Sequence, residues 1–200
     1  MQKLLFATFN KHKCTEVAAL LGDRYEIVMP SAIGYHEEPE EDADTLEGNA
    51  LIKARALYHF TKASCFADDT GLEVEALDGA PGVHSARFAG IAHDDTSNRQ
   101  KLLELLREVP APRKARFRTV IAFIDADGHE HLFEGVVEGN IIVEERGNRG
   151  FGYDALFVPL GEERTFAEMS EAEKNGLSHR ARAIEAFAEF LEKRSHLGGL

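Results

Sequence analysis

Two adjacent carboxylates after a short apolar run carry the clearest catalytic signal in the chain. Asp68 and Asp69 follow residues 64–67, a predicted strand that stops there, and precede Thr70 and Gly71. Ligands of α/β sheets gather at the carboxyl ends of strands, and paired carboxylates there could hold Mg²⁺ and orient a water molecule. The alternative is a polar β-turn, because Asp and Gly are common turn residues. The pair alone favours neither interpretation.

A polar segment between a predicted strand, residues 3–7, and a predicted helix, residues 11–21, is a candidate phosphate loop. A strand-to-helix turn directs free N–H groups and the positive end of the helix dipole at one point. Neither GxxxxGK[ST] nor GxGxxG is present, and a capped helix start is the alternative. The segment consists of Thr8, Phe9, Asn10, Lys11, His12 and Lys13.

The loop of residues 34–45 is rich in carboxylates. Charge runs of this kind are usually solvated surfaces, but a metal that bridges phosphates needs one or two carboxylates beside water. One of these side chains could join Asp69 as a ligand, and spacing does not select which. The loop carries Glu37, Glu38, Glu40, Glu41, Asp42 and Asp44.

An aromatic–Gly–aromatic–Asp run is a candidate base-binding segment. Phe151, Gly152, Tyr153 and Asp154 precede a predicted strand, residues 155–158. A ring there could stack on a base while the carboxylate binds the base edge. The alternative is a pair of core aromatic residues around a tight turn.

Three cationic side chains lie near the start of the last predicted helix, residues 178–193. Lys174 precedes the break at Asn175-Gly176, and His179 and Arg180 lie in the first turn of that helix. Cations there oppose the helix dipole, which favours an anionic or electron-rich ligand as their partner. The alternative is that Arg180 pairs with Glu171 or Glu173.

The remaining elements predict an α/β protein. A strand over residues 25–29 follows the first helix, and Thr45 is the expected N-cap of the next helix, 46–61. Alternation and the Asp127-Gly128 turn indicate a hairpin, with His129 and His131 on an exposed face. Further elements are an extended segment at 72–77, helix 98–109, a capping box from Ser170 to Glu173 and a frayed tail over 195–200.

Composition excludes several functions. The 200 residues carry a formal net charge of −12, which argues against general nucleic-acid binding. Two cysteines do not make a disulfide scaffold or a zinc site, and no apolar run approaches the length of a signal peptide or membrane helix. A cytoplasmic protein without a membrane or nucleic-acid partner is expected.

Five stretches in order resemble one family, the noncanonical purine nucleoside triphosphate pyrophosphatases, which are the inosine/xanthosine triphosphatases of the RdgB type. They are residues 7–13, 66–72, 79–88, 150–154 and 173–180. The resemblance implies an α/β fold with an elongated mixed β-sheet flanked by helices, in one domain (1–200) with two lobes and a central substrate cleft. It implies a homodimer that hydrolyses dITP, ITP and XTP with Mg²⁺ to the monophosphate and pyrophosphate, cleansing the nucleotide pool.

The resemblance also implies roles for individual residues. Asp69 is the expected catalytic residue and a metal ligand, with Glu40 as the preferred second ligand and Glu38 and Glu41 close behind. Residues 8–13 would hold the triphosphate, Thr70 would touch the substrate and Arg87 would face the substrate or a second subunit. The base would be held by Phe151, Gly152, Tyr153 and Asp154 and read by Lys174, His179 and Arg180.

The chain departs from the family pattern at one position, and two other functions are alternatives to the one that the resemblance implies. The family often has Gly where this chain has Phe9, so the Phe9 ring is expected to project away from the phosphates. A Maf-like pyrophosphatase acting on pyrimidine or modified nucleotides is the enzymatic rival. A non-catalytic nucleotide-binding regulator is the second alternative function.

Overall fold

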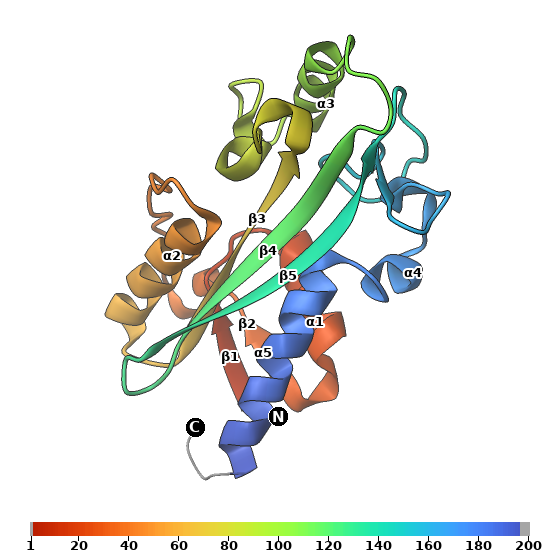
Figure 1. Ribbon diagram of the computed structural model, residues 1–200. Helices are drawn as coiled ribbons and strands as arrows, with labels where there is room; N and C mark the ends of the chain where they lie inside the picture. The colour runs from red at the N-terminus through yellow and green to blue at the C-terminus, as the bar shows by residue number, and fades with distance from the viewer. Residues whose placement is uncertain (1, 197–200) are drawn as a thin grey trace. The chain divides into compact units, whose positions relative to one another are not determined.

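The computed structural model describes residues 2–196, and the chain divides into two compact units (Figure 1). The first unit takes in the chain up to Asp69, Thr119–Gly135 and the chain from Ala181 onward; the second takes in Thr70–Arg118 and Val136–Arg180. Six strands are hydrogen-bonded in the order β2-β1-β3-β4-β5-β6. Strand β1 pairs in parallel with β2 and β3, whereas β5 and β6 are antiparallel. The predicted mixed sheet flanked by helices is therefore confirmed.

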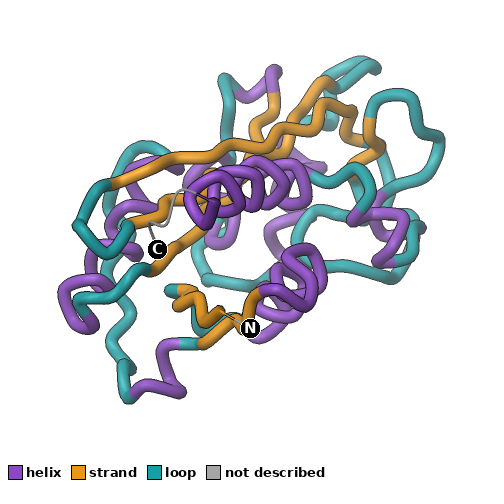
Figure 2. The backbone as a smooth tube through the Cα atoms, turned by 90° about the horizontal axis from the view of Figure 1, so that it is seen from below, coloured by secondary structure: helices purple, strands orange, loops and turns teal. Residues whose placement is uncertain are grey.

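The first unit is built from alternating strands and helices, which can be followed along the tube in Figure 2. Its helices begin where short polar side chains accept hydrogen bonds from free N–H groups: Asn10 caps α1 and Thr45 caps α2. Helix α1 ends at Gly22, whose φ of 68° suits glycine. The elements are β1 Gln2–Phe6, α1 Lys11–Leu21, β2 Tyr25–Val28, α2 Leu46–Thr61 and most of α5 His179–His196.

The core of the first unit is aromatic. Phe6 and Phe66 stack with ring centroids 4.4 Å apart, and Phe187 of α5 packs on Phe66 and Phe123. Helices α1 and α5 contribute to this core through Val17, Leu21 and Leu191 among others, and this cluster contains no residue of α2.

The second unit has its own core, in which Phe117, Phe157 and Phe166 are in mutual ring contact. A capping box at Ser170 and Glu173 opens α4, as the sequence predicts. Strands β3, β4 and β5 each have residues in both units. The remaining elements are β3 Cys65–Val74, α3 Asp95–Leu105, β4 Lys114–Ile124, β5 Glu130–Ile141, β6 Phe157–Pro159 and α4 Glu171–Asn175.

The strand that carries the two aspartates is longer than predicted. Strand β3 runs without interruption from Cys65 to Val74, so Asp68 and Asp69 lie in its middle, and the predicted stop at residue 68 is wrong. Residues 75–77 form a 3-10 helix and are not extended. Strand β1 pairs with β3 only at Cys65 and Phe66, so beyond them the neighbouring strand is β4, and membership in the sheet overrides the turn preference of Asp and Gly.

Other boundaries also differ from the predicted ones. Helix α3 begins three residues earlier, because Asp94 accepts a hydrogen bond from the Ser97 N–H and caps it. Strand β6 is shifted toward the C-terminus. Helix α5 continues through His196, and residues 197–200 of the predicted tail lie outside the described residues. Among residues 2–196 there is no helix long and apolar enough to cross a membrane.

Candidate functional site

A cluster of carboxylates and lysines lies where β1 ends beside β3. Strand β1 pairs with β3 only as far as Phe6 and Phe66, after which the chain turns away from the sheet. Lys13 on α1 then lies 3.2 Å from Asp68, and Lys53 on α2 lies 3.4 Å from Asp69 (Nζ to Oδ1 in each pair). The two aspartates therefore receive a cation from each of two helices.

Lys53 also contacts the acidic loop, through a 2.5 Å ion pair between its Nζ and Oε1 of Glu41. Glu41 is half-buried, whereas Glu38 and Glu40 are exposed. The structure thus brings Glu41, rather than the preferred Glu40, to the cation that binds Asp69. The three residues Glu41, Lys53 and Asp69 are called the carboxylate–lysine cluster below.

Burial and charge shift the pKa of two members of this cluster. Burial raises the pKa of the Asp69 carboxyl, and the neighbouring charges of Glu41 and Asp68 add to this, against the opposite effect of Lys53 and Lys13. For Lys53, burial opposes the charged form, but the surrounding carboxylates outweigh it and raise the pKa of the ammonium. Lys53 is therefore a fixed positive charge, and Asp69 is a stronger base than an exposed aspartate.

The candidate phosphate loop is capped by its own side chains. Oδ1 of Asn10 accepts hydrogen bonds from the N–H groups of His12 and Lys13, at 2.9 and 3.3 Å, and Oγ1 of Thr8 accepts from the N–H of Asn10 at 3.1 Å. The structure thus shows the capped helix start, and a bound phosphate would have to replace these oxygens as acceptor. The Phe9 ring stacks on Tyr35, with centroids 6.3 Å apart.

In the second unit, the residues predicted to read a base lie together. Arg180 is almost completely buried, with Nη2 3.3 Å from Oγ1 of Thr70, and Lys174 donates to Oδ2 of Asp154 at 2.8 Å. The Lys174 ammonium lies 4.9 Å from the centroid of the Phe151 ring. The guanidinium carbon of Arg180 lies 5.9 Å from the centroid of the same ring, so two cations adjoin one aromatic ring.

His179 belongs to the same group of residues. Its ring is buried and stacks on Phe117 with centroids 4.7 Å apart. Glu173, the alternative partner considered for Arg180, instead pairs with Arg164. The residues Asp154, Phe151, Lys174, His179 and Arg180 are called the cationic cluster below.

The two aromatic residues of the segment 151–154 have different surroundings. Phe151 is 44% exposed and so is able to stack on a ligand, whereas Tyr153 is buried and donates its hydroxyl to the Ser85 carbonyl at 2.7 Å. Burial raises the pKa of that hydroxyl. The core interpretation therefore describes the Tyr153 ring, and the ligand interpretation suits Phe151.

Gly150, just before this segment, has no space for a side chain because the Asp154 carboxylate lies against it. Gly150 has a φ of 72°, and a Cβ there would lie 2.1 Å from Oδ2 of Asp154. That same oxygen accepts from the Phe151 N–H at 3.0 Å. The loop conformation and the position of the Asp154 carboxylate are thus determined together.

Sequence reasoning missed Lys53. A signal was present, because Lys53 interrupts the apolar run Ala50, Leu51, Ile52 and Ala54 on α2, yet a single lysine in a helix is usually a surface residue. Only its burial beside two carboxylates distinguishes it.

A second group of acidic residues lies at the hairpin turn of the first unit. Asp125, Asp127 and His129 are close enough together to hold an ion. However, Oδ1 of Asp125 accepts from the N–H groups of Asp127 and His129, and Oδ2 lies 2.7 Å from Nη1 of Arg194 and 3.1 Å from Nε2 of His131. Asp125 therefore joins the turn to α5, and half-buried His131 is not on an exposed face as predicted.

This arrangement predicts a pH-dependent contribution to stability. Burial opposes ionisation of Asp125, but hydrogen bonds from His129, His131 and Arg194 outweigh it and hold the pKa of the carboxyl well below its usual range. Asp125→Asn is expected to lower the free energy of unfolding by about 2–3 kcal/mol at pH 7. The contribution is present above about pH 4 and is lost as the pH falls toward the folded-state pKa.

Urea unfolding of both proteins at several pH values measures this difference. The gap between wild type and Asp125→Asn should narrow steadily below about pH 4. Equal stabilities at pH 7, or a gap of constant size down to pH 2, would contradict the assignment. Asp127→Asn, which changes an exposed carboxylate of the same turn, is the matched control.

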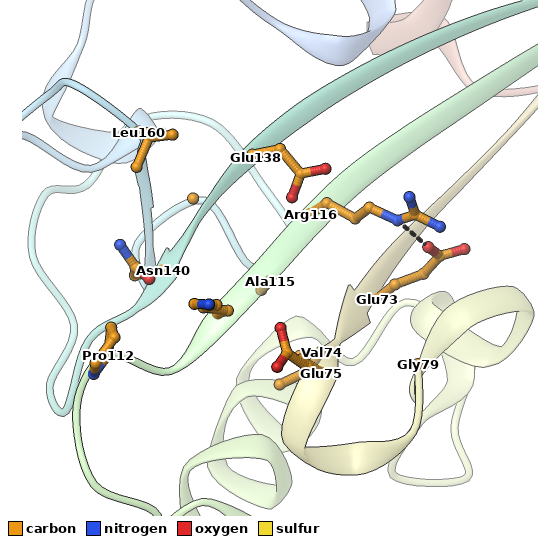
Figure 3. Close-up of a pocket in the computed structure, with 12 residues that line it drawn as sticks. Glu73, Val74, Glu75, Gly79, Pro112, Ala115, Arg116, Glu138, Asn140 and Leu160 are labelled. Carbon is orange, nitrogen blue, oxygen red and sulfur yellow. Dashed lines mark hydrogen bonds and ion pairs between the residues drawn. The ribbon is translucent and has the colours of Figure 1, made fainter.

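A pocket of about 610 Å³ in the second unit contains none of the predicted site residues. Figure 3 shows Arg116 and Glu73 paired across its wall, with Nε 2.5 Å from Oε2. We assign this pocket no part in the chemistry described here.

The fold, the carboxylate–lysine cluster and the cationic cluster together define a class of protein. Its members are mixed-sheet α/β proteins with a polar loop after the first strand and acidic residues on a central strand. The particular family follows from comparison with known proteins. A model of the Ham1 family matches residues 4–190, and the chain belongs to that family. The predicted family resemblance is therefore confirmed.

Relatives and solved structures agree over nearly the whole chain. A dITP/XTP pyrophosphatase of Porphyromonas gingivalis is 55% identical, with 96% of this chain and 98% of the relative covered, and one of Christiangramia forsetii is 47% identical, covering 96% and 100%. The Ham1 protein of Staphylococcus aureus has a TM-score of 0.89 at 34% identity, covering 96% and 100% of the two chains. A HAM1 protein of Coxiella burnetii has 0.88 at 36%, with the same coverage.

Proposed function

We propose that this chain is a nucleoside triphosphate pyrophosphatase that hydrolyses dITP, ITP and XTP to the monophosphate and pyrophosphate. The observation that carries the proposal is the carboxylate–lysine cluster, because it places a basic carboxylate, a second carboxylate and a fixed cation together in one half-buried site. The names of the relatives, dITP/XTP pyrophosphatase, support the substrate class. The enzyme acts as a cytoplasmic homodimer in this proposal, as the family resemblance implies.

Asp69 is the proposed catalytic residue. Hydrolysis of the α–β bond requires a water oxygen to attack the α-phosphorus while the pyrophosphate oxygen leaves in line. The Asp69 carboxylate orients that water and accepts its proton, a role suited by its raised pKa. Its ion pair with Lys53 keeps the carboxylate in one position.

The lysines and the phosphate loop stabilise charge in this mechanism. Lys13 neutralises negative charge that develops on the leaving pyrophosphate, and its present partner Asp68 is the acceptor that the phosphate replaces. Phosphate oxygens likewise take the place of the Asn10 and Thr8 side chains on the N–H groups at the start of α1.

The donor set of the cluster fits a magnesium ion. Glu41 and Asp69 supply carboxylate oxygens, the ligand type that Mg²⁺ prefers, and both contact one lysine. Mg²⁺ held there would neutralise phosphate charge and polarise the attacked phosphorus. This assignment replaces Glu40 with Glu41 as the second ligand.

The cationic cluster accounts for selection of the purine base. ITP and XTP present an acceptor at position 6 of the purine, whereas ATP presents an amino donor. Lys174, His179 and Arg180 are buried donors, so the ATP amino group would face donors at the place where ITP and XTP present an acceptor. The exposed Phe151 ring stacks on the base in this proposal.

A product assay tests the function. The purified chain is incubated with Mg²⁺ and, separately, ITP, XTP, ATP, GTP and dTTP, and pyrophosphate and orthophosphate are quantified. Pyrophosphate released mainly from ITP and XTP is the expected result. Activity on dTTP alone would favour a Maf-like enzyme, orthophosphate would place cleavage at another bond, and binding of ITP without turnover would indicate a regulator.

The choice of metal ligand makes a separate prediction. Glu41→Gln is expected to raise the Mg²⁺ concentration for half-maximal activity by about 10- to 100-fold, because the amide loses the charge that binds the ion. Glu40→Gln, a matched change one residue away at an exposed position, should leave it within about 2-fold. A Mg²⁺ titration of both variants at saturating ITP measures the difference, and the reverse order would restore Glu40 as the ligand.

A further inference from the structure

Three aromatic residues from different segments of the first unit form a continuous row of ring contacts. Phe9 of the phosphate loop stacks on Tyr35 with an interplanar angle of 18°, and Tyr35 packs on Phe60 of α2 with centroids 5.1 Å apart. Both separations lie in the range of favourable aromatic pairs. Tyr35 is buried at the start of the acidic loop, so it lies between the phosphate loop and the helix.

The acidic loop runs back along α2 from this point and contacts the helix at successive positions. Tyr35 meets Phe60, Glu41 meets Lys53, and the Ala43 N–H donates to Oδ1 of Asn49 at 3.0 Å. Phe60 and Lys53 are seven residues apart and so lie on the same side of the helix, about 10 Å from each other along its axis. The loop is therefore attached to one helix face at three places.

Two of these attachments do not depend on formal charge, the ring packing of Tyr35 and the hydrogen bond from Ala43 to Asn49, and only the first also reaches the phosphate loop. Residues 35–43 have no regular secondary structure, and most side chains between Tyr35 and Glu41 are exposed. The loop's six carboxylates repel one another and the Asp68–Asp69 pair. Ring packing at Tyr35 opposes that repulsion without adding a cation that would compete for the same carboxylates.

We propose that Tyr35, held between Phe9 and Phe60, is a positioning residue that sets where Glu41 lies relative to Asp69 and joins the acidic loop to the phosphate loop. The proposal rests on the proposed function, in which Glu41 and Asp69 hold Mg²⁺. It also gives Phe9 a role at a position where the related family often has glycine: its ring supports the acidic loop and is not part of the phosphate cradle.

The test compares Tyr35→Ala and Tyr35→Phe with the wild-type chain in two measurements. The first is cleavage by a glutamate-specific protease, followed by mass spectrometry of fragments cut at residues 37–41. Tyr35→Ala should be cut at least about 5-fold faster, because the loop opens more often. The second is the Mg²⁺ concentration for half-maximal pyrophosphate release, which should rise about 10-fold while kcat at saturating Mg²⁺ stays within about 3-fold.

Conservative and control variants separate positioning from loss of stability. Tyr35→Phe keeps the ring and should match the wild type in both measurements, while Phe60→Ala, which changes a mostly exposed residue, should resemble Tyr35→Ala. Phe190→Leu changes a half-buried ring of the same unit that contacts Phe123, Phe133 and His131, and should alter neither.

Equal cleavage rates for the wild type and Tyr35→Ala would overturn this inference whatever the activity. Faster cleavage without a change in Mg²⁺ dependence would also overturn it, because Glu41 would then be placed by other contacts. So would the same changes in Phe190→Leu. A wild-type chain that releases no pyrophosphate from ITP would instead overturn the proposed function.

Discussion

Replacement of Asp69 by Asn is expected to lower kcat for ITP hydrolysis by about 100- to 10,000-fold, the range for loss of a general base. The amide keeps the shape of the side chain but accepts no proton from water. Because burial and neighbouring carboxylates raise the pKa of Asp69, its charged form costs stability at neutral pH. The variant should therefore be at least as stable as the wild type, and its KM for ITP should change far less than kcat.

Steady-state kinetics and a thermal melt of the same samples measure this prediction. Asp23→Asn, an exposed aspartate of the same unit, is the control and should retain full activity. Near-normal kcat in Asp69→Asn would remove Asp69 from the catalytic role. A large loss of activity accompanied by a lowered Tm would show a folding defect, and would contradict the argument from its pKa.

The second prediction with a large expected effect concerns which purine base the enzyme accepts in its substrate. Arg180→Gln is expected to reduce the ratio of kcat/KM for ITP to that for ATP by about 100-fold, the value of one hydrogen bond to a charged group. Arg180 has the largest side chain among the almost fully buried residues. Glutamine retains a hydrogen-bond donor and much of the length of arginine, so the cavity that the substitution leaves is limited. The ratio falls because the variant binds ITP less well and penalises the ATP amino group less.

Kinetics with both nucleotides for Arg180→Gln and Arg164→Gln measure this effect. Arg164 is an exposed arginine of the same unit, paired with Glu173, and its replacement should leave the ratio unchanged. An unaltered ratio in Arg180→Gln would assign base selection to other residues. Parallel losses for ITP and ATP would make Arg180 a binding residue without selectivity.

Local signals in the sequence predicted much of the fold. The bounds of α1 and α2 match the predicted residues, because Asn10 and Thr45 are side chains that cap helices wherever the following pattern is helical. The hairpin of β4 and β5 follows in the same way from alternation and its Asp-Gly turn. The full length of strand β3 was not predicted, because the strands that pair with it are distant from it in the sequence.

Local signals in the sequence also predicted only part of the candidate site. Residue types made Asp69, the phosphate loop, Phe151 and the three cationic residues Lys174, His179 and Arg180 candidates, and the resemblance of five stretches in order to one family implied their roles. The roles of these residues and the single two-lobed domain with a central cleft remain predictions.

What the sequence by itself determined is therefore the chemistry available to this protein: carboxylates, cations and an aromatic ring in an α/β chain of the Ham1 family. Only the tertiary structure decided which of them meet. It brought Lys53 to both Glu41 and Asp69, left Glu40 exposed, and buried Tyr153 while leaving Phe151 exposed. The physical reason is that burial and ion pairing depend on helix faces and strand neighbours that lie far apart along the chain, whereas capping and turn preferences act within a few residues.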